Sequence, residues 1–202
     1  PQAALAIAGT TPFDMASAYN LSVIPLFVLM GEVASGTRLS AELFSAARIM
    51  LSGVRGGLAV ATLAASACFG AVCGSSVATA ATMTRIALPE LRKAGYDDGL
   101  STGSLAAGGS LGILIPPSII LVIYAAIAEQ SVPRLFAAAL IPGLLLTGLY
   151  ILVAITVAHL RPQSAPASEK VSARERFAAL RQPWQFLLLF IGTIGGIYAG
   201  VF

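Results

Sequence analysis

The chain alternates long apolar runs with shorter polar stretches. A soluble protein explains one such run by burying it as a core helix, whereas a repeated series indicates an α-helical protein that crosses a membrane several times. The final residues of another apolar segment occupy 1–8. The complete apolar runs cover 21–36, 58–84, 100–128, 135–160 and 184–202.

Two of the polar stretches have helical periodicity. In 37–53 the apolar residues Leu39 and Leu43 recur at helical spacing with the charged residues elsewhere on the surface, which predicts an amphipathic helix lying in the membrane interface. The polar linker 161–183 contains a second, shorter amphipathic pattern over 172–180.

Two apolar runs are interrupted in their middle by residues with low helix propensity. The stretch "GAVCGSSVATAATM" (70–83) contains Gly-Ser-Ser, and "GGSLGILIPPSIILVIYA" (108–125) contains Pro-Pro-Ser. Proline lacks an N–H donor and disfavours helix in the residue before it. We therefore expect a discontinuous transmembrane helix, with one half from Leu100 to about Ile115 and the other from Pro117 or Ser118 to Ala128.

The loop charges decide how the first broken run lies in the membrane. If 58–84 crossed, four of the twelve Lys and Arg residues would lie on one side and eight on the other. If it turns back at Gly74–Ser76, eleven share one side and only Arg134 faces the other. Because positive charge collects in cytoplasmic loops, the count predicts a re-entrant helical hairpin that enters from the cytoplasm.

Composition supports the membrane class. The 202 residues are 57% hydrophobic and 10% charged, against about 25% charged in soluble domains. The net charge of +3 is spread over loops, so we expect no nucleic-acid partner. Cys68 and Cys73 fit small core residues. The first residue is Pro1 and the last apolar run stops at Phe202, so we expect a piece of a longer protein.

Broken helices place backbone groups at membrane depth. Carbonyls freed at 73–76 and 112–115 would form a hard oxygen cage suited to an alkali cation, and N–H groups after Ser76 and Pro117 suit an anion. Secondary transporters build their sites in this way. Close helix packing could account for either break by itself. Two breaks, together with the hairpin predicted from the loop charges, favour a binding site.

Other polar residues have simpler explanations. Glu32 is ionisable inside an apolar run, which leaves open a functional role or a position near the membrane surface. Asp97 and Asp98 precede a helix and fit a helix cap. His159, the only histidine, fits an interfacial helix end and is too remote to serve as the base of a serine protease at Ser75.

Several stretches resemble a known family. They are "IPLFVLMGEVAS" (24–35), "GSSVATAATM" (74–83), the run from Ala87 to Ala125 and "LFAAALIPGLLL" (135–146). In this order they are similar to the large, DctM-like membrane subunit of tripartite ATP-independent periplasmic (TRAP) transporters. That subunit has two inverted repeats and about twice this length, which implies that this chain holds the first repeat and, at 184–202, the start of the second.

The resemblance implies a Na⁺-coupled symporter with no catalytic residue, covalent cofactor or metal other than Na⁺. It would import a small organic anion, such as a C4-dicarboxylate, across a bacterial or archaeal cytoplasmic membrane. A small four-helix membrane subunit and a soluble extracytoplasmic substrate-binding protein would be its partners. The elevator mechanism of the family would divide the chain into a scaffold with an interfacial helix (1–57), transport-domain elements (58–130), a transmembrane helix (135–160), a cytoplasmic linker (161–183) and the second-repeat start.

The family's motifs also imply site residues. Gly74, Ser75, Ser76, Gly112, Pro116 and Pro117 would form a Na⁺ site, and Ser76, Thr79, Thr82 and Ser118 would line the substrate pocket. Many members carry Asp at the place of Thr79, and threonine supplies no fixed negative charge. The alternatives are a symporter of another elevator family that needs no binding protein, and a channel or structural membrane subunit.

Overall fold

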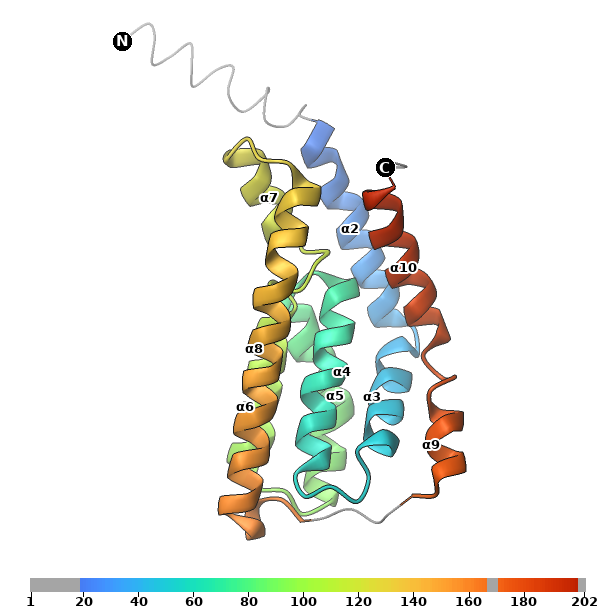
Figure 1. Ribbon diagram of the computed structural model, residues 1–202, viewed down its shortest axis with the longest axis vertical. Helices are drawn as coiled ribbons and strands as arrows, with labels where there is room; N and C mark the ends of the chain where they lie inside the picture. Colours follow the sequence, from blue (N-terminus) through green and yellow to red (C-terminus); the bar gives the residue numbers. More distant parts are fainter. Residues whose placement is uncertain (1–18, 167–170, 200–202) are drawn as a thin grey trace, which may run out of the picture.

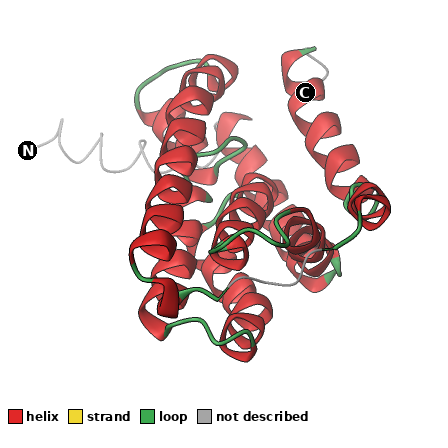
Figure 2. Cartoon of the chain, turned by 60° about the horizontal axis from the view of Figure 1, so that its bottom comes forward, coloured by secondary structure: helices red, strands yellow, loops and turns green. Residues whose placement is uncertain are grey.

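The structure, a computed structural model, describes residues 19–166 and 171–199, so the expected segment 1–8 lies outside it. Every regular element within these ranges is helical, which confirms the all-α class (Figure 2). The elements are α2 (Tyr19–Gly36), α3 (Leu39–Met50), α4 (Gly57–Cys73), α5 (Ser76–Lys93), α6 (Asp98–Leu111), α7 (Ile119–Ile127), α8 (Val132–Leu160), η1 (Pro162–Ser164), α9 (Ala173–Ala179) and α10 (Trp184–Tyr198).

The helices form an elongated bundle with most axes along its length (Figure 1). The long helix α8 runs along one side, and α6 and α7 pack against different parts of it. On the other side α2 lies above α3, and α10 lies above α9. On this side, therefore, two shorter helices in succession cover the length of the bundle.

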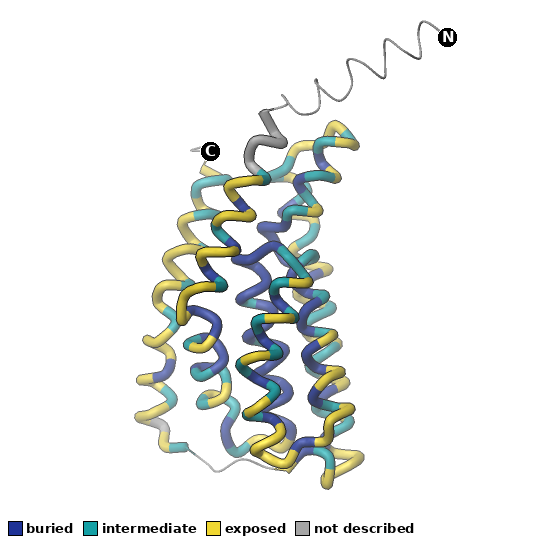
Figure 3. The backbone as a smooth tube through the Cα atoms, turned by 180° about the vertical axis from the view of Figure 1, so that it is seen from behind, coloured by how far each residue is buried: buried dark blue, intermediate teal, exposed yellow. Residues whose placement is uncertain are grey.

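Helix α4 forms the centre of the bundle. It is apolar around its whole circumference, and nearly all of its residues are buried, as expected for a helix with neighbours on every side (Figure 3). It packs against α2, α3, α5, α6, α8 and α10. Any element attached to the end of α4 is consequently held in the interior.

Helices α4 and α5 form an antiparallel hairpin whose base lies near the C-terminal end of α8. A carbon added at Gly56 would come within 2.6 Å of the Ala158 side chain, and the Leu58 N–H donates to the Tyr96 hydroxyl over 3.3 Å. The 17 residues of α4 rise about 25 Å at 1.5 Å per residue. The turn between the two helices therefore lies inside the bundle, near mid-height.

Helix α5 is longer than the sequence pattern indicated. The stretch 85–99 was expected to be polar and outside the hairpin, but the helix continues to Lys93. Met83, Ala87 and Leu91 are four residues apart and completely buried, so they extend the inward face of α5 beyond the predicted boundary. Charged residues and Pro89 between them obscured this periodicity.

Both amphipathic helices are present, as α3 and α9. Helix α3 packs its apolar face on α4 and is joined to α5 by an ion pair, in which Arg48 lies 2.9 Å from Glu90. Helix α9 begins with a capping box at Ser172, and Arg176 donates to the Ser52 carbonyl over 2.8 Å. Their location in a membrane interface stays a prediction.

Helix α8 is the element among the described residues that is long and apolar enough to cross a membrane by itself. Its 29 residues extend about 43 Å, close to the 40–45 Å of a bilayer with its headgroups. Large apolar side chains such as Ile141 and Leu145 are exposed on its outer face. This surface is suited to lipid or to other membrane helices.

Candidate functional site

The turn of the hairpin is built from a glycine and a serine. Gly74 follows α4 with a φ of +65°, in the left-handed region that glycine adopts at least cost, and its N–H donates to the Gly70 carbonyl over 2.7 Å. Ser75 is extended and caps α5, because its hydroxyl accepts from the Ala78 N–H over 3.4 Å. The helix break predicted at Gly74–Ser76 is confirmed.

The second break lies between α6 and α7. Helix α6 ends at Leu111, not near Ile115, and 112–118 forms turns that include a cis peptide bond between Pro116 and Pro117. The Ser118 hydroxyl donates to the Ile113 carbonyl over 2.7 Å, which closes the segment on itself. Helix α7 then begins at Ile119, just after the predicted start at Pro117 or Ser118, without a side-chain cap on its first N–H groups.

The two breaks are in contact with each other. A carbon added at Gly74 would lie 3.3 Å from the Pro117 carbonyl oxygen, and one added at Gly112 would lie 3.1 Å from the Ser75 carbonyl oxygen. One added at Gly70 would lie only 2.6 Å from the Gly112 Cα. The absence of side chains at these glycines therefore lets the backbones of the hairpin tip and the broken helix touch.

The juxtaposed ends differ in polarity. Helices α4 and α6 bring their C-terminal carbonyl ends to this point, whereas α5 and α7 begin here and present N–H groups that have no partner inside their own helix. A single small region of the interior thus offers oxygen ligands beside hydrogen-bond donors. Such a region is suited to a cation and an anion bound close together.

Thr79 is the predicted site residue with the most unusual environment. It is completely buried, and within the described residues its hydroxyl has no neighbour better suited to a hydrogen bond than the weak Cys73 thiol. The same hydroxyl oxygen would lie 2.9 Å from a carbon added at Gly112, so it faces the second break. A buried hydroxyl without a strong partner costs about 1–3 kcal/mol, which a ligand at the site would offset.

All but one of the other predicted residues lie at the contact between the two breaks, and Thr82 is the exception. Gly74, Gly112, Pro116, Pro117 and Ser118 are buried at the contact, and Ser75 and Ser76 are half-buried at the edge of the tip. Thr82 is half-buried one turn beyond Thr79, and none of the hydrogen bonds in the described part of the chain joins it to either break.

Two residues at the tip were not predicted to belong to the site. Helix α2 passes the tip at Gly31, where an added carbon would come within 2.8 Å of the Cys73 carbonyl oxygen. The hydroxyls of Ser35 and Thr79 both lie beside the Cys73 thiol, a weak hydrogen-bonding group, and neither has a stronger partner within the described residues. In the sequence, the spacing of Gly31 and Ser35, four residues apart on α2, was the feature that could have indicated this contact.

Glu32 follows Gly31 and is exposed. Because Gly31 touches Cys73, this carboxylate lies level with the hairpin tip rather than at the base of the bundle. Both explanations left open by the sequence, a functional role and a position near the membrane surface, stay predictions.

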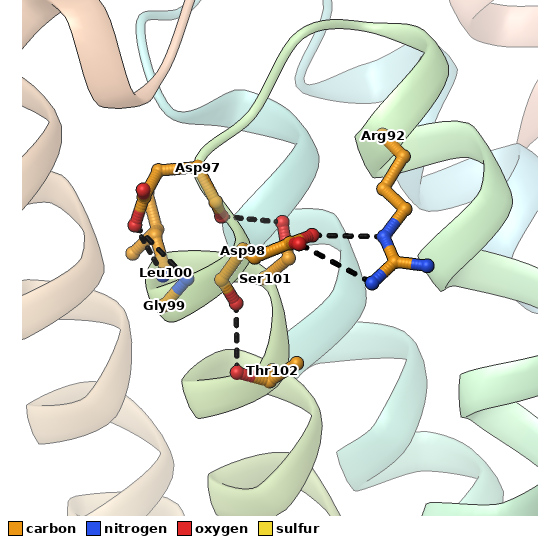
Figure 4. Close-up of polar contacts among 7 residues, drawn as sticks. All are labelled: Arg92, Asp97, Asp98, Gly99, Leu100, Ser101 and Thr102. Atoms are coloured by element: carbon orange, nitrogen blue, oxygen red, sulfur yellow. Dashed lines mark hydrogen bonds and ion pairs between the residues drawn. The ribbon is translucent and has the colours of Figure 1, made fainter.

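The acidic pair before α6 forms a helix cap, as expected (Figure 4). An Asp97 carboxylate oxygen accepts from the N–H groups of Gly99 and Leu100 over 2.9 and 3.2 Å. Asp98 pairs with Arg92 over 2.8 Å, and the guanidinium lowers the pKa of this exposed carboxyl below its usual value. These residues stabilise the start of α6 rather than forming a paired-acid site.

The fold and the contact between the two breaks define an all-α membrane protein with backbone ends gathered in its interior. Comparison with known families assigns it further: residues 2–202 match the family described as "Tripartite ATP-independent periplasmic transporter, DctM component". The chain belongs to this family, which confirms the resemblance seen in the sequence.

Relatives in the family are named as transporter permeases for different substrates. The chain is 40% identical to the C4-dicarboxylate TRAP transporter large permease protein of Pseudomonas aeruginosa over 94% of its own length and 44% of that protein. It is 33% identical to the ectoine permease of Halomonas elongata, over 91% and 42% of the two chains. It is 30% identical to the sialic acid permease of Haemophilus influenzae, over 91% and 30%. The chain thus spans less than half of these relatives.

Proposed function

We propose that this chain forms the first part of the membrane permease of a Na⁺-coupled TRAP transporter that imports a small organic anion. The single observation that carries the proposal is the contact between the hairpin tip at Gly74–Ser76 and the helix break at 112–118. It supports a site in which both elements hold the ions, with the rest of the permease completing the site.

The Na⁺ ion would be held by oxygen atoms of the tip and the break. The Ser75 carbonyl oxygen lies beside Gly112, and the Pro117 carbonyl oxygen lies beside Gly74. The Thr79 hydroxyl adds a neutral oxygen whose neighbour within the described residues is the weak Cys73 thiol. Ser76, Pro116 and Pro117 fix the backbone around these oxygens. Neutral oxygen ligands suit a monovalent cation, because no carboxylate is needed to balance its single charge.

The anion would bind at the N-terminal ends of α5 and α7. The substrates named for the three relatives share a carboxylate group, to which free N–H groups at a helix start can donate hydrogen bonds. Ser76 and Thr82 would contribute side chains to the pocket. Because the Ser118 hydroxyl already donates to Ile113, Ser118 would bind the anion through its backbone N–H.

The mechanism would be of the elevator type. The hairpin α4–α5 and the broken helix α6–α7 would move together across the membrane, with the small four-helix subunit holding the scaffold and the soluble binding protein delivering substrate. The complex would act in the cytoplasmic membrane of a bacterium or archaeon. The contact between the two breaks supports their movement as one unit.

We expect Thr79→Val to raise the Na⁺ concentration needed for half-maximal uptake by about 5- to 150-fold, because a hydroxyl contributing about 1–3 kcal/mol to Na⁺ binding is lost. The measurement is Na⁺-dependent uptake by the full-length permease with its partners in proteoliposomes. Thr62→Val is the matched control, since Thr62 is equally buried in α4 but its hydroxyl donates to Leu58. Unchanged Na⁺ activation in Thr79→Val would refute the proposed ligand, and uptake without Na⁺ or the binding protein would indicate a channel or another symporter family.

The re-entrant path of the hairpin makes a separate prediction. Cysteines replacing Arg55 and Lys93, in a background with Cys68 and Cys73 changed to alanine, should react with an impermeant thiol reagent from the cytoplasmic side. A cysteine replacing Arg134 should react from the other side only. Labelling of the first two positions from opposite sides would show that 58–84 crosses the membrane.

A further inference from the structure

A groove with a volume of about 510 Å³ lies between α6 and α8, away from the hairpin tip. Its walls are apolar, with Leu100 and Ala107 on α6 and Val153 and Val157 on α8. Gly103 opens the α6 wall, because a carbon added there would meet no heavy atom within 4 Å. The volume is within the 300–1,000 Å³ that is typical of small-molecule sites.

The two ends of the groove are fixed by hydrogen bonds, one between the start of α6 and η1, which follows α8, and one between α6 and α8. At the first end, the Asp97 N–H donates to the Ser164 carbonyl over 3.0 Å. At the second end, the hydroxyls of Ser110 and Tyr150 are 3.3 Å apart. The helices are therefore held together at both ends, and the space between them is a trough with a definite length.

Opposite charges lie at the first end only. Arg161 and Asp97 both line the groove and both are exposed. The ion pairs within the described residues are those of Arg48 with Glu90 and Arg92 with Asp98, so these two groups are not paired with each other. The mouth of the groove thus offers a free guanidinium and a carboxylate to an approaching molecule.

A third polar group lies deeper in the trough. Ser104 lines the groove, is only 5% exposed, and forms no side-chain hydrogen bond within the described residues. Seven residues of helix separate it from Asp97, or about 10 Å along α6. The Ser104 oxygen stays accessible from the trough, so its hydroxyl can donate to an acceptor of a molecule that occupies the trough.

The length of the groove matches one leaflet of a membrane. From Tyr150 to Arg161 the groove follows α8 for about 16 Å, and half of a 40–45 Å bilayer is about 20 Å. Arg161 directly follows the end of α8, at the depth of the headgroups. The charged mouth therefore lies where a lipid has its headgroup, and the apolar trough lies where it has its acyl chain.

We propose that this groove binds one phospholipid of the cytoplasmic leaflet whose headgroup carries both a phosphate and a primary ammonium. Arg161 pairs with the phosphate, Asp97 accepts from the ammonium, and Ser104 donates to an ester carbonyl of the glycerol backbone. One acyl chain lies between α6 and α8. A transmembrane helix would match the apolar walls but would leave the charged mouth without a partner.

Native mass spectrometry of the full-length permease tests this proposal, with phosphatidylethanolamine, phosphatidylcholine and phosphatidylglycerol added in separate titrations. We expect one molecule of phosphatidylethanolamine to be retained most strongly. Gly103→Leu should reduce its retention at least about tenfold by filling the trough, and Arg161→Gln should reduce it about tenfold through loss of a charge-assisted hydrogen bond. Asp97→Asn, which keeps the helix cap, should reduce retention of phosphatidylethanolamine and leave that of phosphatidylglycerol unchanged.

Matched variants separate these effects from general damage to the protein. Gly148→Leu adds the same side chain to α8 where an added carbon meets nothing, and Arg134→Gln removes a cation at the opposite end of α8. Both should retain phosphatidylethanolamine as the unmodified permease does. Equal retention in Gly103→Leu and Gly148→Leu, or equal binding of all three lipids, would overturn the proposal. A disulfide formed between Gly103→Cys and a cysteine elsewhere in the permease would also overturn it, because protein would then fill the groove.

Discussion

Gly70→Ala is expected to abolish Na⁺-driven uptake by the full-length permease while leaving the protein folded in the membrane. The added carbon would come within 2.6 Å of the Gly112 Cα, where only backbone can yield. Relief of that contact forces the hairpin tip and the broken helix apart, at a cost of about 1–3 kcal/mol in stability. Because a displacement of about 1 Å in a binding geometry can reduce rates about 100-fold, we expect uptake to fall by at least that factor.

The control for this variant is Gly148→Ala, on α8, where an added carbon meets no neighbour. Uptake and thermal unfolding of both variants should be measured in the same preparation. Gly148→Ala should transport normally and be slightly stabilised, as expected for alanine in place of glycine in a helix. Normal uptake by Gly70→Ala would contradict the role assigned to the contact between the breaks.

The double variant Pro116→Ala/Pro117→Ala is expected to lose transport by a different route, through gain of helix. Each proline removes a backbone donor and opposes helix by about 3 kcal/mol, and the neighbouring residues of 112–118 are mostly apolar and compatible with helix. Once both prolines are replaced, α6 and α7 should join into one continuous helix. The bond from Ser118 to the Ile113 carbonyl and the contact of Pro117 with Gly74 would then disappear.

Amide hydrogen exchange and uptake measure the two consequences separately. The N–H groups of Ile113, Ser118 and the two new alanines should be protected, whereas those of Leu114 and Ile115 are already hydrogen-bonded to Leu111. Uptake should fall to background without loss of protein from the membrane. Pro142→Ala, inside α8, is the control that replaces a proline in a helix without changing a break, and it should transport normally. Retained uptake with newly protected amides would show that the break is dispensable.

The helix ends at the hairpin tip were predictable because their causes are local. A glycine able to adopt a left-handed conformation and a serine able to cap the next helix are adjacent in the chain, so the break at Gly74–Ser76 follows from short-range chemistry. The start of α7 follows in the same way from the two prolines. The distribution of Lys and Arg among the loops also predicted that α4 and α5 pair as a hairpin, although this pairing is a long-range feature of the fold.

The remaining features depend on contacts between distant segments. Helix α6 ends at Leu111 because Gly112 packs against Gly70 and the Ser75 carbonyl, which no local pattern records. The approach of Ser35 to the tip likewise depends on how α2 crosses α4. The sequence therefore predicted the two breaks, but their mutual contact and the third helix beside them required the structure.

The ion pair between Arg48 and Glu90 has a consequence for the movement of the permease. It ties α3 to the hairpin, and α3 also packs along α4, whereas a short turn at 37–38 separates α3 from α2. The turn is held by local hydrogen bonds, from the Thr37 N–H and hydroxyl to the Ala34 carbonyl, and a carbon added at Gly36 would meet no atom within 4 Å. If the hairpin moves as proposed above, we expect α3 to move with it, and the chain to bend at the end of α2 rather than after α3.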